Sequence, residues 1–234
     1  MKSLLLLEKE LRKHANSERA RVSMRYFKTG KGEYGEGEQF LGVAVPIQRS
    51  LAAKYANQVT DADISVLLSS PYHEIRLTAL FMLNTRFLKS ADQAEAKNWV
   101  NFYLSHVHCI NNWDLVDSSA PIVLGKWLQN RNRRILYQFA QSKNLWKNRI
   151  AMLTTLAFIR NNELDDLLKL AEIFISHPHD LMHKATGWML REGWKRDSKV
   201  IEAFLSKFKS QMPRTMLRYA IEKMSPAKKN YYMK

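Results

Sequence analysis

The chain has 234 residues, 46% of them hydrophobic, and is therefore long enough to bury a core in one or two domains. Its 37 Lys and Arg outweigh 22 Asp and Glu, a net charge of +15 that favours a polyanionic partner, with nucleic acid ahead of an anionic membrane surface or a merely soluble basic surface. The lone Cys109 excludes a disulfide framework and a multi-cysteine metal site, and Leu4–Leu7 is too short for a signal core or a membrane span. We therefore expect a soluble cytoplasmic protein.

Apolar residues recur every three or four positions and no run alternates as a strand would, so the sequence predicts an all-α fold. The expected helices, in chain order, span residues 3–26, 46–57, 61–69, 71–88, 92–108, 112–129, 131–141, 144–161, 163–176, 179–194, 197–210 and 213–224. Pro121 should kink or end the helix that starts near Asn112. We expect the Gly-rich loop at about 29–40 to be mobile and the basic tail 225–234 to be frayed. The loop matches G-x-G-x-x-G, but no strand precedes it, so a dinucleotide site is not indicated.

The helices pair, and their second members begin with similar phrases. If Arg76, Asp117, Arg149, Lys184 and Arg218 are equivalent, the gaps between them are 41, 32, 35 and 34 residues. A period of this size predicts one domain over 1–234, an α-solenoid of HEAT-like antiparallel helical repeats with a concave basic surface. The repeated position is basic in four cases and acidic only at Asp117.

Positive charge is concentrated in the second half of the chain. Residues 1–117 have a net charge of +2 and residues 118–234 a net charge of +13. In that half Lys184, Trp188 and Arg191 have the spacing i, i+4, i+7, which places an indole between two cations on one helix face. Trp146 and Arg149 repeat the pairing at i+3. Such interleaving suits base stacking and phosphate binding.

Trp113 and Asp117 stand four residues apart, on one face of the predicted helix. The ordinary interpretation is a buried indole and an acid near a helix N-terminus. The alternative is an acid that faces a positively charged substrate. Two other groups are weaker candidates. His177, His179 and His183 could be metal ligands or a solvated helix start. Arg131, Arg133 and Arg134 could contact phosphate or form a solvated turn.

Over nearly its whole length the chain resembles the AlkD-like DNA alkylation-repair glycosylases, which are HEAT-like repeat proteins. The markers are Arg25-Tyr26, Phe40-Leu41-Gly42-Val43 with Pro46 and Arg49, Trp113-Asp114-Leu115-Val116-Asp117-Ser118, Pro121 with Leu124-Gly125, Trp146 with Arg149, and Lys184-Ala185-Thr186-Gly187-Trp188-Met189-Leu190-Arg191-Glu192. The 29–40 loop departs from the family pattern.

The resemblance implies that the protein excises positively charged N3- and N7-alkylated purines from duplex DNA, and would then be associated with the nucleoid when it is bound to DNA. The residues indicate no metal or organic cofactor, and we expect a monomer because one duplex would fill the concave face. Asp117 would be the catalytic carboxylate, Trp113 and Trp188 the indoles against the deoxyribose of the lesion, and Arg149 a phosphate or active-site contact. Tyr26 would also line the cleft, and the resemblance suggests that the damaged base can stay stacked, which would explain tolerance of bulky adducts. From the recurrence of cations along the repeats we expect DNA contacts on the concave surface, with Arg49 as a further contact: Arg76, Lys184, Arg191 and Arg218.

Two other functions compete with this one. A non-enzymatic helical-repeat module that binds nucleic acid or an acidic protein would use the same fold and charge, with Asp117 as a helix-start acid. A membrane-surface protein would need an amphipathic helix with an exposed apolar face, and the sequence contains no such helix. Burial of Asp117 in a salt bridge away from a basic groove would favour the module.

Overall fold

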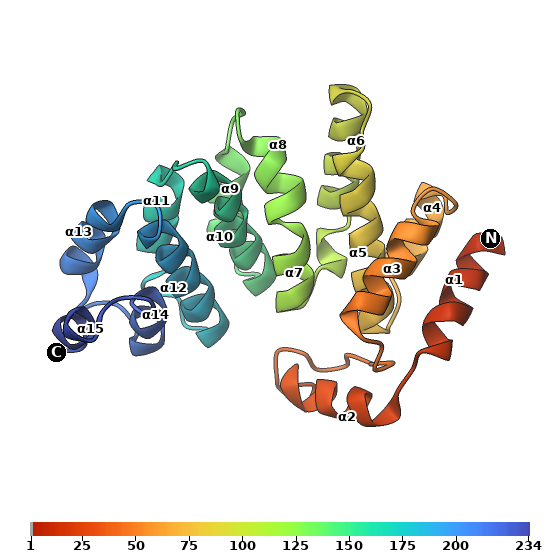
Figure 1. Cartoon of the computed structure of the whole chain (residues 1–234), viewed down its shortest axis with the longest axis horizontal. Coiled ribbons are helices and arrows are strands. Elements are labelled where there is room, and N and C mark those ends of the chain that lie inside the picture. Colours follow the sequence, from red (N-terminus) through yellow and green to blue (C-terminus); the bar gives the residue numbers. More distant parts are fainter. Residues whose placement is uncertain (1) are drawn as a thin grey trace. The chain divides into compact units, whose positions relative to one another are not determined.

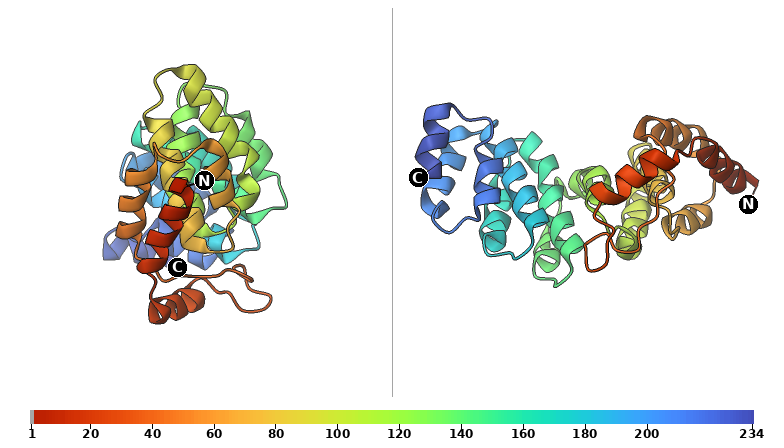
Figure 2. Two further views of the ribbon diagram at one scale, coloured as in Figure 1. Left: turned by 90° about the vertical axis from the view of Figure 1, so that its right-hand side faces the viewer. Right: turned by 90° about the horizontal axis from the view of Figure 1, so that it is seen from below.

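The computed structural model describes residues 2–234, and every regular element in that range is helical (Figure 2). The predicted all-α fold is confirmed. One isolated bridge, between Gln39 and Tyr72, is the nearest approach to a strand pair in the described residues. The chain forms two compact units, Met1–Ser119 and Ala120–Lys234. The single domain predicted from the repeats stays a prediction.

The first unit is built around α5 (His73–Leu88), whose side chains are almost all buried. Around it pack α3 (Val45–Tyr55), α4 (Asp61–Leu68), α6 (Gln93–Ser105) and α7 (Trp113–Ser119), while α1 (Lys2–Lys13) packs on α3 (Figure 1). A single-turn helix, η1 (Val107–Cys109), precedes α7. The unit is completed by α2 (Ser17–Tyr26) and the long loop that follows it.

The predicted helix 3–26 is wrong in its middle, because α1 and α2 are separate helices. Asn16 has an extended backbone, and its side chain accepts a hydrogen bond from the Arg19 amide at 2.8 Å, as an N-cap does. The Asn16 amide donates to the Leu41 carbonyl at 2.9 Å. A cap and a long-range hydrogen bond therefore outweigh the apolar periodicity that runs through the break.

The second unit starts with a π-helical turn, η2 (Pro121–Gly125), that runs into the short α8 (Lys126–Leu128). Two helix pairs then follow, α9 (Arg134–Ala140) with α10 (Leu145–Arg160) and α11 (Asp165–Phe174) with α12 (Asp180–Trp194). After them, α13 (Ser198–Phe208) and α14 (Arg214–Ala220) both pack on α12. The helices α10, α12 and α14 pack on one another in that order. Arg149, Lys184 and Arg218 are each the fifth residue of their helix, which agrees with the repeat predicted from the sequence.

The basic tail is ordered, contrary to the frayed end that its composition suggests. It forms α15 (Pro226–Met233), which is capped by the Ser225 side chain and starts with a proline at a position that suits one. Tyr232 anchors the helix, since its side chain is buried and its hydroxyl donates to the Glu202 carbonyl at 3.4 Å. The Lys228–Glu202 ion pair and a hydrogen bond from Arg214 to the Met233 carbonyl also hold the helix on the unit.

Candidate functional site

The helix α7 carries Trp113 and Asp117, as predicted. It starts directly after Asn112, whose side-chain oxygen accepts a hydrogen bond from the Trp113 amide at 2.8 Å and whose carbonyl accepts one from Val116. It ends before Pro121, which confirms the predicted break. Both Trp113 and Asp117 are partly exposed, and four residues of helix place them on one face.

An aromatic cluster surrounds Trp113. The Phe27 ring stacks on the indole, with centroids 5.0 Å apart and planes at 10°, and Tyr26 meets it edge-on at 5.7 Å. Phe27 also contacts Phe40 at 5.0 Å, and Phe40 stacks on the His73 ring at 4.8 Å. Tyr26 thus lies beside Trp113 and remains 66% exposed. Phe27 was not among the residues selected from the sequence, and Phe40 was selected only as a family marker and not as a site residue.

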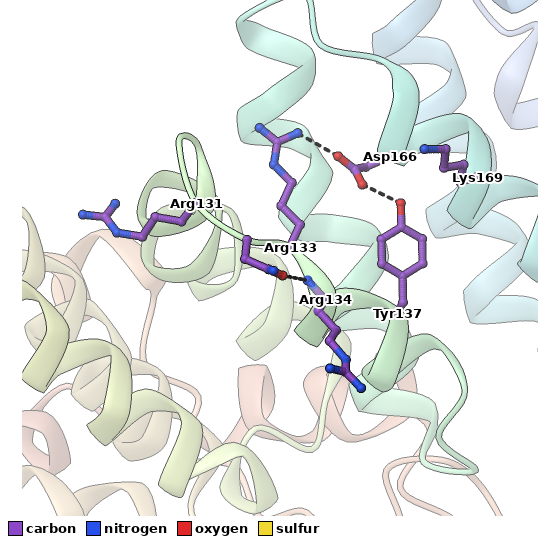
Figure 3. Close-up of a pocket in the computed structure, with 7 residues that line it drawn as sticks. Arg131, Arg133, Arg134, Tyr137, Asp166 and Lys169 are labelled. Atoms are coloured by element: carbon purple, nitrogen blue, oxygen red, sulfur yellow. Dashed lines mark hydrogen bonds and ion pairs between the residues drawn. The ribbon is translucent and has the colours of Figure 1, made fainter.

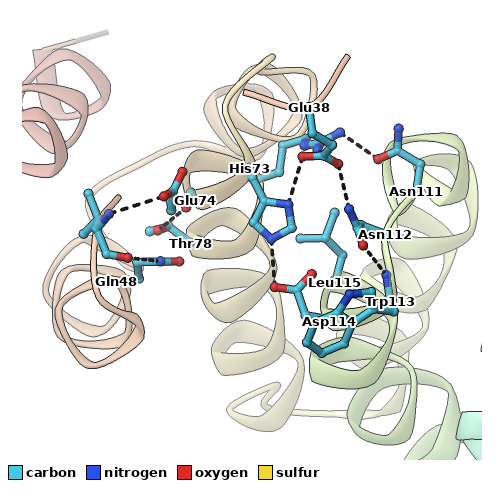
Figure 4. A network of polar contacts seen from close by, with 12 residues as sticks. Glu38, Gln48, His73, Glu74, Thr78, Asn111, Asn112, Trp113, Asp114 and Leu115 are labelled. Atoms are coloured by element: carbon cyan, nitrogen blue, oxygen red, sulfur yellow. Dashed lines mark hydrogen bonds and ion pairs between the residues drawn. The ribbon is translucent and has the colours of Figure 1, made fainter. Parts of the chain in front are cut away.

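A buried network of charged side chains lies under this cluster (Figure 4). His73 is at its centre, with Nδ1 2.9 Å from a Glu38 carboxylate oxygen and Nε2 2.7 Å from Asp114 Oδ2. Arg76 donates to the other oxygen of Glu38 and, at 2.7 Å, to Asn111. The loop, α5 and the first turn of α7 are thereby joined. Glu38, His73 and Asp114 were absent from the residues that the sequence analysis selected.

The network keeps His73 protonated. Burial alone would lower the pKa of this imidazole, but the Asp114 and Glu38 carboxylates outweigh burial and raise the pKa to about 9. Burial would likewise raise the pKa of Glu38, and the cationic His73 and Arg76 hold it below its ordinary value instead. A cation between two acids is therefore the state that the folded protein favours near neutral pH.

This shift predicts a loss of stability at alkaline pH. Because the pKa of His73 is higher in the folded protein than its ordinary value, its contribution to the free energy of unfolding is complete below about pH 6.5. That contribution is lost as pH rises through about 9. The free energy of unfolding should fall by an amount on the order of a few kcal/mol over that window. Urea unfolding at several pH values, with the parent beside His73→Gln, measures it. An equal pH dependence in the two proteins would contradict the assignment.

The loop that was expected to be mobile is fixed at its C-terminal end. The Glu74 carboxylate accepts hydrogen bonds from the amides of Leu41, Gly42 and Val43, at 2.9, 2.7 and 3.3 Å. Gly42 has a φ of +77°, and a Cβ there would lie 2.0 Å from the Asn16 carbonyl oxygen. Only glycine suits that position. The loop is thus attached to α5 at the same end that carries Glu38.

Two arginines of the first unit were predicted to contact DNA, and the structure shows that one is buried and the other is exposed. Arg76 is 7% exposed and bonded to Glu38 and Asn111, so its charge is neutralised inside the unit and does not fit phosphate binding. Arg49 is exposed, with its guanidinium over the Phe81 ring at 4.0 Å. Both positions carry an arginine before apolar residues, and the two differ in how far the folded unit buries the side chain.

In the second unit α10, α12 and α14 carry the other predicted residues. Arg149 is buried, at 5% exposure, and donates to the Leu181 carbonyl at 2.7 Å, which ties α10 to the start of α12. Lys184 is half-buried and pairs with Asp180 at 2.7 Å. Arg218 is exposed and lines a cavity of about 500 Å³ together with Lys184. Lys184 and Arg218 thus line the same cavity, while the Arg149 guanidinium donates to a backbone carbonyl.

Trp188 and Arg191 lie on the same helix, α12, as their spacing predicts. The Trp188 indole donates to Glu192 at 3.2 Å and lines a cavity of about 350 Å³ with Leu156, Ile159 and the cations Arg160, Lys195 and Arg196. Arg191 pairs with Glu222 and with Glu192. The Trp188 cavity combines an aromatic wall with cations, as a nucleotide site would require.

The three arginines and three histidines that were weaker candidates all lie in the second unit. Arg133 is held by Asp166, to which Tyr137 also donates at 2.5 Å (Figure 3), and by Glu163. An open cavity of about 740 Å³ is lined by Arg133, Tyr137 and Asp166 together with the exposed Arg131, Arg134 and Lys169. The three histidines are partly exposed, and within residues 2–234 no group of three or more His, Cys, Asp or Glu is arranged to hold a metal ion.

Comparison with known proteins gives a match to a protein family and matches to solved structures. Residues 7–224 match the model of a protein family described as DNA alkylation repair enzyme. The chain is also similar to a solved structure described as "Predicted DNA alkylation repair enzyme from Enterococcus faecalis", with a TM-score of 0.70 and 17% sequence identity over 91% of this chain and 98% of that one. At that identity the likeness shows a shared fold. No curated protein matches the chain, and no described helix is long and apolar enough to cross a membrane.

Proposed function

The chain belongs to the family of DNA alkylation repair enzymes, and we propose that it is a DNA glycosylase that excises positively charged N3- and N7-alkylated purines from duplex DNA. The observation that carries the proposal is the pair on α7: a partly exposed carboxylate, Asp117, one helical turn after an indole in an aromatic cluster. The family itself supports an enzyme of alkylation repair with DNA as its partner.

The proposed chemistry needs only one carboxylate. Alkylation at N3 or N7 gives the purine a positive charge and makes it a good leaving group, so no acid has to protonate it. Cleavage of the N-glycosidic bond develops positive charge on the sugar, and a nearby carboxylate stabilises that charge and orients the attacking water. Asp117 would serve this role, with no metal or organic cofactor.

The aromatic residues beside Asp117 would bind the lesion. An indole attracts a cation to its face, and Tyr26 adds an exposed ring next to Trp113. Phe27 already covers one face of Trp113, so the nucleotide would use the rest of the indole. We assign Trp188 and Arg149 of the second unit to the same reaction on the family resemblance, together with phosphate contacts from Lys184, Arg191 and Arg218.

The preference for charged lesions tests this mechanism. We expect release of 7-methylguanine and 3-methyladenine from alkylated duplex DNA, and no comparable release of neutral uracil or hypoxanthine. The reason is that the protein supplies charge stabilisation and no activation of the leaving group. Single-turnover release from matched duplexes measures it. Efficient excision of a neutral base would refute the mechanism.

A non-enzymatic DNA-binding module remains the second candidate, and the Phe27–Trp113 stack favours it. If that stack is permanent, one indole face is a packing surface and Trp113 presents less area to a lesion. The module would bind alkylated and undamaged duplexes equally and release no base. The same excision assay, run beside a binding assay, separates the two functions.

A further inference from the structure

Two chains of contacts lead from His73 to the first turn of α7. The polar chain runs from the His73 imidazole directly to Asp114, at 2.7 Å. The aromatic chain runs from the His73 ring to Phe40, which stacks on it, and to Phe27 at 4.8 Å. The Phe27 ring stacks on Trp113. Since Asp114 and Trp113 are neighbours in sequence, the two chains close on the same turn of helix. His73 is therefore the point from which both the backbone and the indole of that turn are held.

Glu38 connects the same histidine to the loop. The His73 and Glu38 side chains are only 2% and 4% exposed, and Asp114 is 16% exposed, so water competes little with their contacts. Asp114 Oδ1 has no hydrogen-bond partner in the described residues, and Asp114 Oδ2 is held by His73. Arg76 binds the second oxygen of Glu38. Each acid is thus fixed by a buried cation.

The geometry requires a protonated histidine. Carboxylates accept hydrogen bonds on both sides of the ring, and a neutral imidazole has only one N–H to donate. An imidazolium donates to both. Around His73 the charged groups are Glu38 from the loop, Asp114 from α7, and Arg76 and Glu74 from α5 itself, the last turned to the loop amides.

We propose that Glu38, His73 and Asp114 are positioning residues that lock the first turn of α7, and thereby hold Trp113 and Asp117 in the orientation that base excision requires. The inference rests on the proposed function. These three residues do not touch the substrate. They act through the Trp113 stack and the helix that carries the carboxylate.

The first test separates catalysis from binding. Glu38→Gln, His73→Gln and Asp114→Asn each remove one charge, and Glu10→Gln, which removes a surface carboxylate paired with Lys54, is the matched control. We expect single-turnover excision of 7-methylguanine to fall about 10- to 100-fold in the three variants, because misplacement by about 1 Å is costly. The Kd for undamaged duplex should stay within about twofold. The Glu10→Gln control should match the parent both in excision rate and in Kd.

The pH profile is a readout that a merely structural role would not move. The ratio of parent to His73→Gln rates should be large near neutral pH and approach one as pH rises through about 9, since the parent then loses its own imidazolium. The ratio cancels any titration of the substrate. A ratio independent of pH, or equal losses of rate and affinity in folded variants, would overturn the proposal.

A spectroscopic test does not depend on excision at all. The Trp113 signal is isolated as the difference between each protein and the same protein with Trp113→Phe. Acrylamide should quench this signal more strongly in Glu38→Gln than in the parent, because the Phe27 stack loosens. Glu38→Gln is the milder variant and keeps an oxygen for His73, so it serves if His73→Gln does not fold. Unchanged quenching would overturn the positioning role, whereas a parent that releases no base would refute only the proposed function.

Discussion

Replacing Asp117 by asparagine should lower the rate of 7-methylguanine release about 10²- to 10³-fold, the cost of losing one well-placed electrostatic group. Asparagine keeps the size of the side chain and some of its hydrogen bonding. It removes the negative charge that opposes the developing sugar cation. Affinity for duplex DNA should hold or increase, because a negative charge facing a polyanion has been removed. Single-turnover release, beside binding to an uncleavable duplex, measures both effects.

Asp165→Asn is the matched control, since it makes the same chemical change at an exposed position of α11. It should excise at the parental rate. If Asp117→Asn also did so, the carboxylate would be structural and the non-enzymatic module would be the better account. A loss of activity that parallels a loss of folding, followed by circular dichroism, would likewise count against a catalytic role.

Salt should have the second large effect, on binding. Ala120–Lys234 contains 22 basic and 9 acidic residues, so we expect phosphate contacts to be concentrated in the second unit. If about six phosphates are neutralised, the affinity for undamaged duplex falls about 10³-fold between about 50 and about 200 mM salt. Titrations across that range give the slope of log affinity against log salt.

Two arginine variants make the salt experiment specific. Arg218→Ala should reduce the slope by about one, because Arg218 is exposed and lines a basic hollow. Arg76→Ala should leave the slope unchanged, because that guanidinium is buried against Glu38. The opposite pattern would show that the sequence-based choice of Arg76 as a DNA contact was right and that the burial argument is wrong.

The sequence predicts those features of the fold that depend on local chemistry. Pro121 ends α7, and the repeat places Asp117, Arg149, Lys184 and Arg218 each at the fifth position of its helix. Helix periodicity and proline geometry are sufficient for both. They fail at Asn16, where a cap and the Leu41 carbonyl divide one apolar stretch into two helices. Local signals therefore locate the elements, and tertiary contacts decide some of their ends.

The polar network could not be predicted in the same way. His73 meets Glu38 across 35 residues and Asp114 across 41, and nothing in the spacing of single residues indicates such pairs. Burial is equally hidden, since Arg49 and Arg76 both appear as cations before apolar runs but only Arg76 lies inside the unit. The phrase Asn111-Asn112-Trp113 did contain a signal, because both asparagines prove to hold the turn that carries the indole.

Release of 7-methylguanine and 3-methyladenine from alkylated duplex DNA by the purified protein tests the central claim most directly. The account predicts free base in the supernatant and abasic sites in the DNA, in equal amounts and in proportion to enzyme in single-turnover conditions. It also predicts that Asp117→Asn binds the same duplex and releases almost none. Tight binding of alkylated duplex by the parent, with no base released above the spontaneous rate, would contradict it.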